Sequence, residues 1–253
     1  MPLLVESDGV VVLATLDRQP VRNALDLDML STLAELLRDP PGRAVVLTGA
    51  GSESFSAGMD LRVLQSLPAN EVAAAVHALD EALDAPDRVP VVAALNGPAS
   101  GGGFELALRC DLVVAAEHAH VHLPEVRHGV VPGGGAVFLP ARIPLAVALE
   151  LGMVGDPMSA ERGYQLGLVN RVVTAADAVA VATELARRMT ENGPLAVRAT
   201  RALMRQTYEQ GVEAARAAAA AVRDSSDLRA EMTEGVAAFL EKRPPRWPTD
   251  SDG

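Results

Sequence analysis

The sequence predicts a layered α/β fold, because strand-like and helix-like segments alternate through its first half. Short runs rich in valine and alanine end at a polar residue or a glycine, as buried strands do; they span residues 10–16, 44–48, 90–95 and 112–115. Between the first two runs, leucines at 27, 30, 33, 36 and 37 share one helical face, and Asp26 can serve as the N-cap. Residues 70–83 and 104–110 are further helix candidates. This alternation favours helices layered on a sheet.

The chain changes character near residue 175. Strand-like runs stop, and helix-like segments follow at 182–189, 195–210, 212–223 and 231–240. Their apolar faces are thin, so we expect them to pack against the main body or another subunit. The sequence therefore predicts a core over residues 1–190 and a C-terminal helical region over residues 191–253.

Composition excludes several classes of function. The 253 residues include 22 Lys and Arg against 33 Asp and Glu, a net charge of −11, which argues against a nucleic-acid partner. The single cysteine, Cys110, excludes an intrachain disulfide and a multi-cysteine metal site. The N-terminus lacks the basic start of a signal peptide, and no apolar run is long enough to span a membrane. We expect a soluble cytoplasmic protein.

The densest motif is a run of three glycines, Gly101–Gly103, between a strand-like and a helix-like segment. Glycines there let another group approach the N–H groups at a helix start, which can bind an anion. A tight turn without a ligand is the alternative. The motif lacks the Lys-Ser/Thr ending of a P-loop and the spacing of a dinucleotide fingerprint, and Ser100 does not match G-x-S-x-G.

Two carboxylates accompany the glycine clusters. Glu105 lies in a largely apolar segment, and Glu125 follows Leu123-Pro124 upstream of Gly133–Gly135. They are far enough apart to come from different elements and meet across a pocket, where paired carboxylates can divide acid and base roles. A surface location of either glutamate is the alternative.

Three histidines, His118, His120 and His122, alternate in sequence. On a strand they would share one face, which invites a metal-site interpretation. A partly covered strand face is the alternative, and we expect no metal.

Five motifs in order resemble the enoyl-CoA hydratase/isomerase (crotonase) superfamily. They are F-x-A-G-x-D at 55–60, N-G-x-x-x-G-G-G-x-E-L-A-L-x-C-D at 96–111, L-P-E-x-x-x-G-x-x-P-G-G-G at 123–135, G-L-V-N-R-V-V at 167–173 and A-F-L-E-K-R-P-P at 238–245. The resemblance covers nearly the whole chain. It implies a crotonase-like spiral of ββα repeats, with a C-terminal helical oligomerisation region that supports a homotrimer or a hexamer built as a dimer of trimers.

The resemblance also implies the chemistry. It places the catalytic glutamates at Glu105 and Glu125, one taking a proton from water as its oxygen attacks C3 and the other delivering a proton to C2. It places the oxyanion-hole N–H groups, which stabilise negative charge on the thioester oxygen, at Ala57 and Gly102. A water-positioning N–H falls on Gly133. The implied CoA-binding residues are Arg22, Ala24, Ala57, Asp60 and Lys242. No separate cofactor is expected, since coenzyme A is part of the acyl-CoA substrate.

The resemblance therefore predicts an enoyl-CoA hydratase, a lyase of fatty acid and lipid metabolism. An isomerase or a carnitinyl-CoA-type dehydratase of the same fold is one alternative, and a non-catalytic acyl-CoA-binding relative is another. Residues 135–142 read G-A-V-F-L-P-A-R where a common hydratase pattern reads G-G-T-Q-R-L-P-R. This departure resembles the carnitinyl-CoA dehydratase branch and leaves the acyl preference open.

Overall fold

A computed structural model describes residues 2–211, residues 213, 216, 218, 219, 221 and 222, and residues 225–247. Two sheets lie in this part of the chain, one of six strands and one of three. The larger sheet has the order β1 (Leu3–Ser7), β2 (Val11–Leu16), β3 (Ala44–Gly49), β4 (Val91–Leu95), β6 (Leu112–Ala116) and β9 (Arg171–Val173). The smaller sheet has the order β5 (Ala99–Ser100), β7 (His120–His122) and β8 (Met158–Ser159). The predicted α/β class is confirmed.

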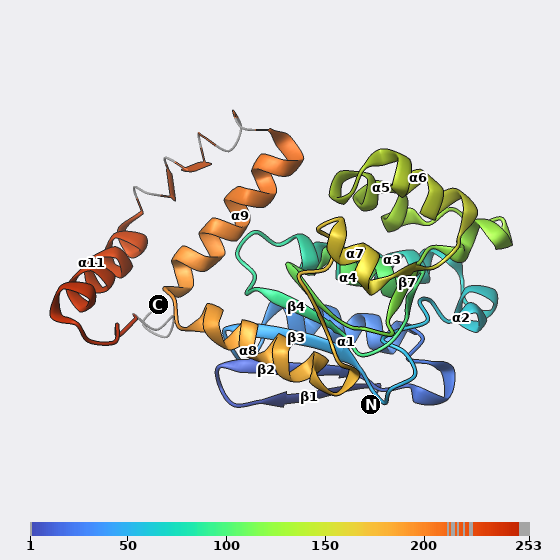
Figure 1. The fold of residues 1–253 in the computed structure, drawn as a ribbon, viewed down its shortest axis with the longest axis horizontal. Coiled ribbons are helices and arrows are strands. Elements are labelled where there is room, and N and C mark those ends of the chain that lie inside the picture. The colour runs from blue at the N-terminus through green and yellow to red at the C-terminus, as the bar shows by residue number, and fades with distance from the viewer. Residues whose placement is uncertain are drawn as a thin grey trace.

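The larger sheet is parallel except for its first pair, in which β1 runs antiparallel to β2. Every residue of β3 and β4 is buried, as expected of parallel strands covered on both faces. Alternate residues face opposite layers: Val45 and Leu47 belong to the main core, whereas Val46 packs with Ala182 and Ala186 of α8 (Ala178–Thr190). Figure 1 shows α8 lying along the sheet.

The remaining helices surround the main core or extend from it. They are α1 (Leu27–Arg38), α2 (Leu61–Ser66), α3 (Ala69–Asp84), α4 (Gly102–Arg109), α5 (Gly133–Arg142), α6 (Leu145–Val154), α7 (Ala160–Gln165), α9 (Pro194–Gln210) and α11 (Ser226–Glu241). Short 3-10 segments occur at Gln19–Val21, Pro124–His128 and Ala175–Asp177. Helices α9 and α11 project from the body on the side opposite to α5 and α6 (Figure 1).

The predicted strands and the predicted helices that fall on described residues are present, with ends shifted by a few residues. Asp26 caps α1, since its Oδ1 accepts a hydrogen bond from the Met29 N–H at 2.9 Å. The sequence analysis did not anticipate β1 as a separate antiparallel strand, the smaller sheet, or the helices α2, α5, α6 and α7. The helix expected over 212–223 lies largely outside the described residues, and the boundary at residue 190 stays a prediction. Within the described ranges, no helix is long and apolar enough to cross a membrane.

One carboxylate ties the helical region to the sheet. Asp111, the residue before β6, accepts hydrogen bonds from Arg88 Nη1 at 2.7 Å and from the Nε of Arg201 of α9 at 2.9 Å. It also accepts from the Val91 N–H at 2.8 Å, while Arg205 Nη2 lies 3.3 Å away. Burial raises the pKa of Asp111 and the arginines lower it; their effect prevails, so the pKa lies below its usual value. Asp111 therefore neutralises Arg201 and Arg205 of α9 at the edge of the sheet.

Replacing Asp111 with asparagine should cost about 3–5 kcal/mol of unfolding free energy near neutral pH, because buried arginines lose their counter-charge. A depressed pKa contributes stability above the unfolded pKa and loses it as the pH falls through the folded pKa. The difference from the wild type should therefore shrink in acid. Urea unfolding at several pH values measures it. Asp156→Asn is the control, because Asp156 pairs with Arg127 on the surface, where such pairs contribute about 0–1 kcal/mol. Equal losses in the two variants would contradict this role for Asp111.

Candidate active site

Two tight turns meet at the carboxyl ends of the central strands. Gly58 has φ 86° and Gly101 has φ 50°, a backbone region that favours glycine. The Ser100 N–H donates to the Ser56 carbonyl at 2.9 Å and joins the turns. A Cβ on Gly58 would lie 2.7 Å from the Ser100 oxygen and 2.9 Å from the Gly102 nitrogen. Only glycine at residue 58 permits this approach.

The approach leaves two backbone donors free. Within the described residues, the N–H groups of Met59 and Gly102 have no hydrogen-bond acceptor. Leu25 bonds to the carbonyl of Gly58 and to the N–H of Asp60, a parallel bridge that leaves the Met59 N–H unused. A Cβ on Gly102 would lie 3.4 Å from the Met59 nitrogen, so the two donors are close.

The expectation for Ala57 does not fit this geometry. The Ala57 N–H donates to the Arg22 carbonyl at 2.9 Å, so it is not available to a bound oxygen. The sequence motif does not show which N–H of the Ala57–Met59 turn is bonded to the neighbouring segment. The structure leaves the Met59 N–H in the position expected of Ala57.

Asn23 holds the turn that contains Gly58 through hydrogen bonds to the segment before it. The sequence analysis did not predict this role. Asn23 is buried, and its side chain donates to the Ser54 carbonyl at 2.8 Å and the Ala50 carbonyl at 3.0 Å. Its carbonyl accepts from Ser56 Oγ at 2.8 Å. Arg22 and Asn23 both have positive φ, which asparagine tolerates better than most residues. The asparagine at position 23 is the one feature of the sequence that could have indicated a residue with positive φ here.

The structure brings Glu105 and Glu125 to one site. Glu105 lies in the first turn of α4, and its Oε1 accepts from the Gly135 N–H at 2.7 Å. Glu125 lies in the Pro124–His128 turn, and a Cβ on Gly101 would come within 2.7 Å of its Oε1. Its Oε2 is buried and has no hydrogen-bond partner among the described residues. One carboxylate is thus held by the protein and the other keeps an unused oxygen.

Their surroundings separate the two carboxylates chemically. Burial raises the pKa of Glu125, and the nearby charge of Glu105 raises it further. Its own backbone N–H and His128 lower the pKa, but the net direction is upward. Glu125 is therefore suited to carry a proton at a pH where an ordinary glutamate has lost it.

A cavity of about 330 Å³ opens beside Glu105 and the free N–H groups of Met59 and Gly102. Its lining residues are Leu25, Leu30, Met59, Val76, Leu79, Asp80, Leu83, Asp84, Gly102, Glu105, Leu106, Arg109, Gly133, Gly134, Val137 and Phe138. Gly133 is the first residue of α5, where backbone N–H groups lack intrahelical acceptors. The cavity combines free N–H donors, a carboxylate and apolar walls, as ligand pockets do.

The histidines do not form one row. His118 lies in the turn before β7, and only His120 and His122 lie on that strand. His122 Nε2 lies 3.2 Å from Ser100 Oγ, and burial, then the charges of His120 and Arg127, lowers its pKa. No group of three metal-ligating side chains occurs in the part of the chain that the structure describes.

The remaining predicted residues fall into two places. Arg22 and Ala24 flank Asn23 beneath the turn, and Asp60 caps α2 while paired with Arg18 at 2.9 Å. Lys242 ends α11, which Figure 1 places on the opposite side of the molecule from α2. One chain therefore does not bring Lys242 to the other predicted residues.

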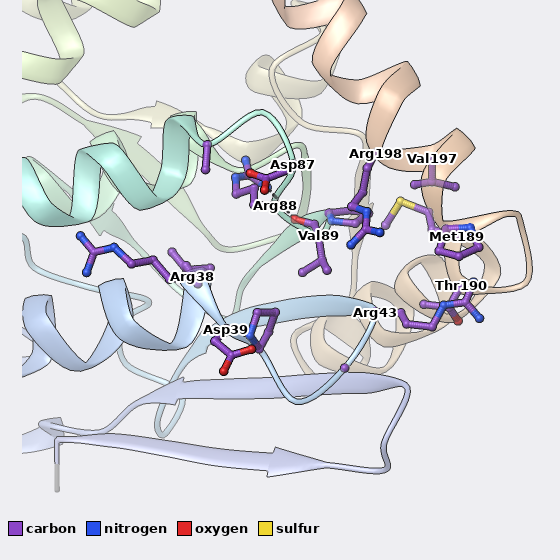
Figure 2. A pocket seen from close by; sticks show the side chains of 16 residues that line it. Arg38, Asp39, Arg43, Asp87, Arg88, Val89, Met189, Thr190, Val197 and Arg198 are labelled. Carbon is purple, nitrogen blue, oxygen red and sulfur yellow. Dashed lines mark hydrogen bonds between the residues drawn. The ribbon is translucent and has the colours of Figure 1, made fainter. Parts of the chain in front are cut away.

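A second cavity, of about 460 Å³, contains none of the predicted residues (Figure 2). It lies near the starts of β3 and β4, the sheet edge opposite to the turns, and arginines line much of it. These arginines already serve the fold: Arg88 pairs with Asp111, Arg38 donates to the Ala78 carbonyl and Arg43 to the Asn192 carbonyl. The cavity at Glu105 is the candidate active site.

Comparison with known proteins gives concordant results. The sequence model of the family described as "Enoyl-CoA hydratase/isomerase" matches residues 6–250. Carnitinyl-CoA dehydratases from Salmonella arizonae and Salmonella enteritidis are each 38% identical, with 95% of both chains covered. A crystal structure of enoyl-CoA hydratase from Mycobacterium tuberculosis superposes with a TM-score of 0.86 at 35% identity, covering 98% of each chain. One from Bacillus anthracis gives 0.86 at 33% identity, covering 98% of this chain and 99% of that one.

Replacing Glu125 with glutamine should raise the melting temperature near pH 8. A raised folded-state pKa contributes stability that is complete below the unfolded value, about 4.5, and is lost as the pH rises through the folded value. The wild type loses this contribution in alkali, whereas glutamine does not titrate. Thermal unfolding between pH 4 and pH 8 measures the difference, which should vanish toward pH 4. A variant that melts below the wild type at pH 8 would contradict the claim that the buried, charged Glu125 side chain destabilises the fold.

Proposed function

Because the chain belongs to the enoyl-CoA hydratase/isomerase family, we propose that it reversibly adds water across the C2=C3 bond of a 2-enoyl-CoA thioester. Its family and its named relatives make it a hydratase-type lyase. The observation that supports this reaction best is the convergence of Glu105 and Glu125 on a site bordered by two free N–H groups.

The N–H groups of Met59 and Gly102 form the oxyanion hole in this proposal. They bind the thioester oxygen and stabilise the negative charge that develops there when water attacks C3. The turns fix both donors before substrate binds, so no reorganisation is needed during the reaction. Ala57 supports the hole through its bond to Arg22.

The two glutamates divide the proton transfers. Glu105, oriented by the Gly135 N–H, accepts a proton from water while the water oxygen bonds to C3. The electrons of the double bond move to the thioester oxygen, and the enolate collapses as Glu125 delivers its proton to C2. The raised pKa of Glu125 suits it to be the donor. The Gly133 N–H helps to hold the water. After the reaction Glu105 releases its proton to solvent and Glu125 takes one up, which restores both carboxyl groups.

No separate cofactor takes part, since coenzyme A belongs to the substrate. Arg22 and Ala24 line the approach of the CoA moiety, and Asp60 supports them through Arg18. Lys242 reaches the CoA bound to a neighbouring subunit. We place the enzyme in the cytoplasm, as its sequence predicts.

Self-association completes the proposal. Large apolar side chains are exposed on the helices that project from the body, namely Met204 and Tyr208 of α9 and Met232, Val236, Phe239 and Leu240 of α11. Large exposed apolar side chains gathered on two projecting helices favour an interface with another molecule. We propose that it joins subunits into a trimer, or a hexamer built from two trimers.

Dehydration of a carnitinyl-CoA-type substrate is the second candidate. The 38% identity to proteins named carnitinyl-CoA dehydratase over 95% of the chain favours it. It is the same chemistry in reverse, with Glu125 taking the C2 proton. Double-bond isomerisation and acyl-CoA binding without turnover are the outcomes that product analysis separates from both.

Glu105→Gln and Glu125→Gln should each lower the turnover of crotonyl-CoA by about 10²–10⁴ with little change in binding, because each removes one proton transfer. The loss of enoyl absorbance and the mass of the product report hydration. Glu117→Gln, an exposed glutamate in the turn after β6, is the matched control and should be as active as the wild type. Full activity in both site variants would eliminate the two-carboxylate mechanism.

Gly58→Ala should lower kcat/KM by about 10²-fold, because its Cβ would push apart the Met59 and Gly102 donors. Gly9→Ala is the matched control: Gly9 has φ 82°, but a Cβ there meets nothing within 4 Å. Both variants place an alanine at a positive φ. A difference between their activities therefore reports the collision at the Gly58 turn and not the backbone strain. Similar activity in the two variants would refute this oxyanion hole.

A further inference from the structure

The cavity of the proposed active site runs along α4 and ends at a cluster of charges. Glu105 and Arg109 are four residues apart on this helix, so they share a face about one turn, or roughly 6 Å, apart. Both line the cavity, together with Met59 and Gly102 at its other end. An acyl chain whose carbonyl lies at Met59 and Gly102 therefore extends toward Arg109.

Arg109 is clamped in place by side chains from two other helices. Its Nη1 lies 2.7 Å from Asp80 Oδ1, and its Nη2 lies 2.6 Å from Asp84 Oδ1 and 3.1 Å from the Asp80 carbonyl. Its guanidinium carbon lies 4.4 Å from the centre of the Phe138 ring. The Arg109 side chain is only 5% exposed, whereas those of Asp80 and Asp84 are about half exposed. The clamp joins α3, α4 and α5 across the end of the cavity.

Apolar and charged side chains share the lining of this cavity. Leu25, Leu30, Leu79 and Leu83 offer apolar contacts to an acyl chain, whereas Arg109, Asp80 and Asp84 are charged. A longer apolar chain would have to pass the guanidinium of Arg109, which Asp80, Asp84 and Phe138 hold in place. Moving Arg109 aside would break two ion pairs of a nearly buried charge, which is costly. The volume of about 330 Å³ is also at the low end for ligand pockets.

We propose that the cluster of Arg109, Asp80, Asp84 and Phe138 is the chain-length filter of this enzyme, which accepts short 2-enoyl-CoA thioesters and rejects long ones. The inference rests on the proposed hydration and adds its substrate class. The filter works through a fixed charge at the end of the acyl cavity, one helical turn beyond Glu105.

The test is kcat/KM for hydration of crotonyl-, hexenoyl-, octenoyl- and decenoyl-CoA by the full-length enzyme. An open apolar tunnel would gain up to about fourfold per methylene buried. The filter predicts instead that decenoyl-CoA is hydrated at least about tenfold less efficiently than crotonyl-CoA. A wild type that prefers decenoyl-CoA overturns the filter. Absence of hydration at every chain length contradicts the proposed function itself, so the two failures are distinguishable.

Two variants identify the residues responsible. Arg109→Ala should raise the ratio of decenoyl-CoA to crotonyl-CoA efficiency at least about tenfold. Phe138→Ala should raise it as well, and it keeps both ion pairs, so it serves if Arg109→Ala fails to fold. Arg38→Ala is the matched control: Arg38 also binds α3, through the Ala78 carbonyl, but does not line the cavity, so the ratio should stay unchanged. An unchanged ratio in Phe138→Ala and in a folded Arg109→Ala overturns the proposal.

Discussion

The close contact of two backbone turns is the constraint on which the site depends. Gly58 and Gly102 approach so closely that a single methyl group at residue 58 would collide with the other turn. The parallel strands β3 and β4 bring the turns together, because both lead out of the same edge of a sheet that is buried on both faces. Asn23 then fixes one turn and α4 begins from the other. The sheet thus brings two backbone N–H donors together, and Ser56 Oγ holds the first turn by bonding to the Asn23 carbonyl and the Gly58 N–H.

The chemistry follows from what surrounds those donors. Glu105 and Glu125 come from different elements and have unequal environments, one held by a glycine N–H and the other buried with an oxygen unpaired. Like charges in proximity push the proton affinities of two carboxylates apart, which gives a pair both an acid and a base. Burying Glu125 beside Glu105 disfavours its charged form, which costs stability at neutral pH. The same environment keeps a proton on Glu125, and the proposed reaction needs that proton for C2. Farther along α4, Arg109 lines the same cavity as Glu105, and we propose that it limits the length of the acyl chain.

Much of this was predictable from local patterns, and the rest depends on contacts between distant segments. The central strands and α1 follow from apolar periodicity and the Asp26 cap, and the predicted family is confirmed. The helix α5 begins with three glycines and contains Pro140, a poor helix sequence that becomes helical only because packing against α4 overrides propensity. The choice of Met59 over Ala57 depends on a bridge to Leu25, more than thirty residues away, which no motif encodes. The clamp on Arg109 is likewise invisible in sequence, since Asp80 and Asp84 appear as an ordinary polar helix face.

The most direct test of the central claim is the carbonyl stretching frequency of a thioester bound at the two turns. Crotonyl-CoA bound to a Glu105→Gln/Glu125→Gln double variant, which keeps both N–H donors but cannot transfer protons, is suited to difference infrared or Raman spectroscopy. Two hydrogen bonds from Met59 and Gly102 polarise the carbonyl, so its band should lie at lower frequency than in free crotonyl-CoA in water. A bound thioester whose carbonyl band stays at the free value would contradict the oxyanion hole and, with it, the account of the site.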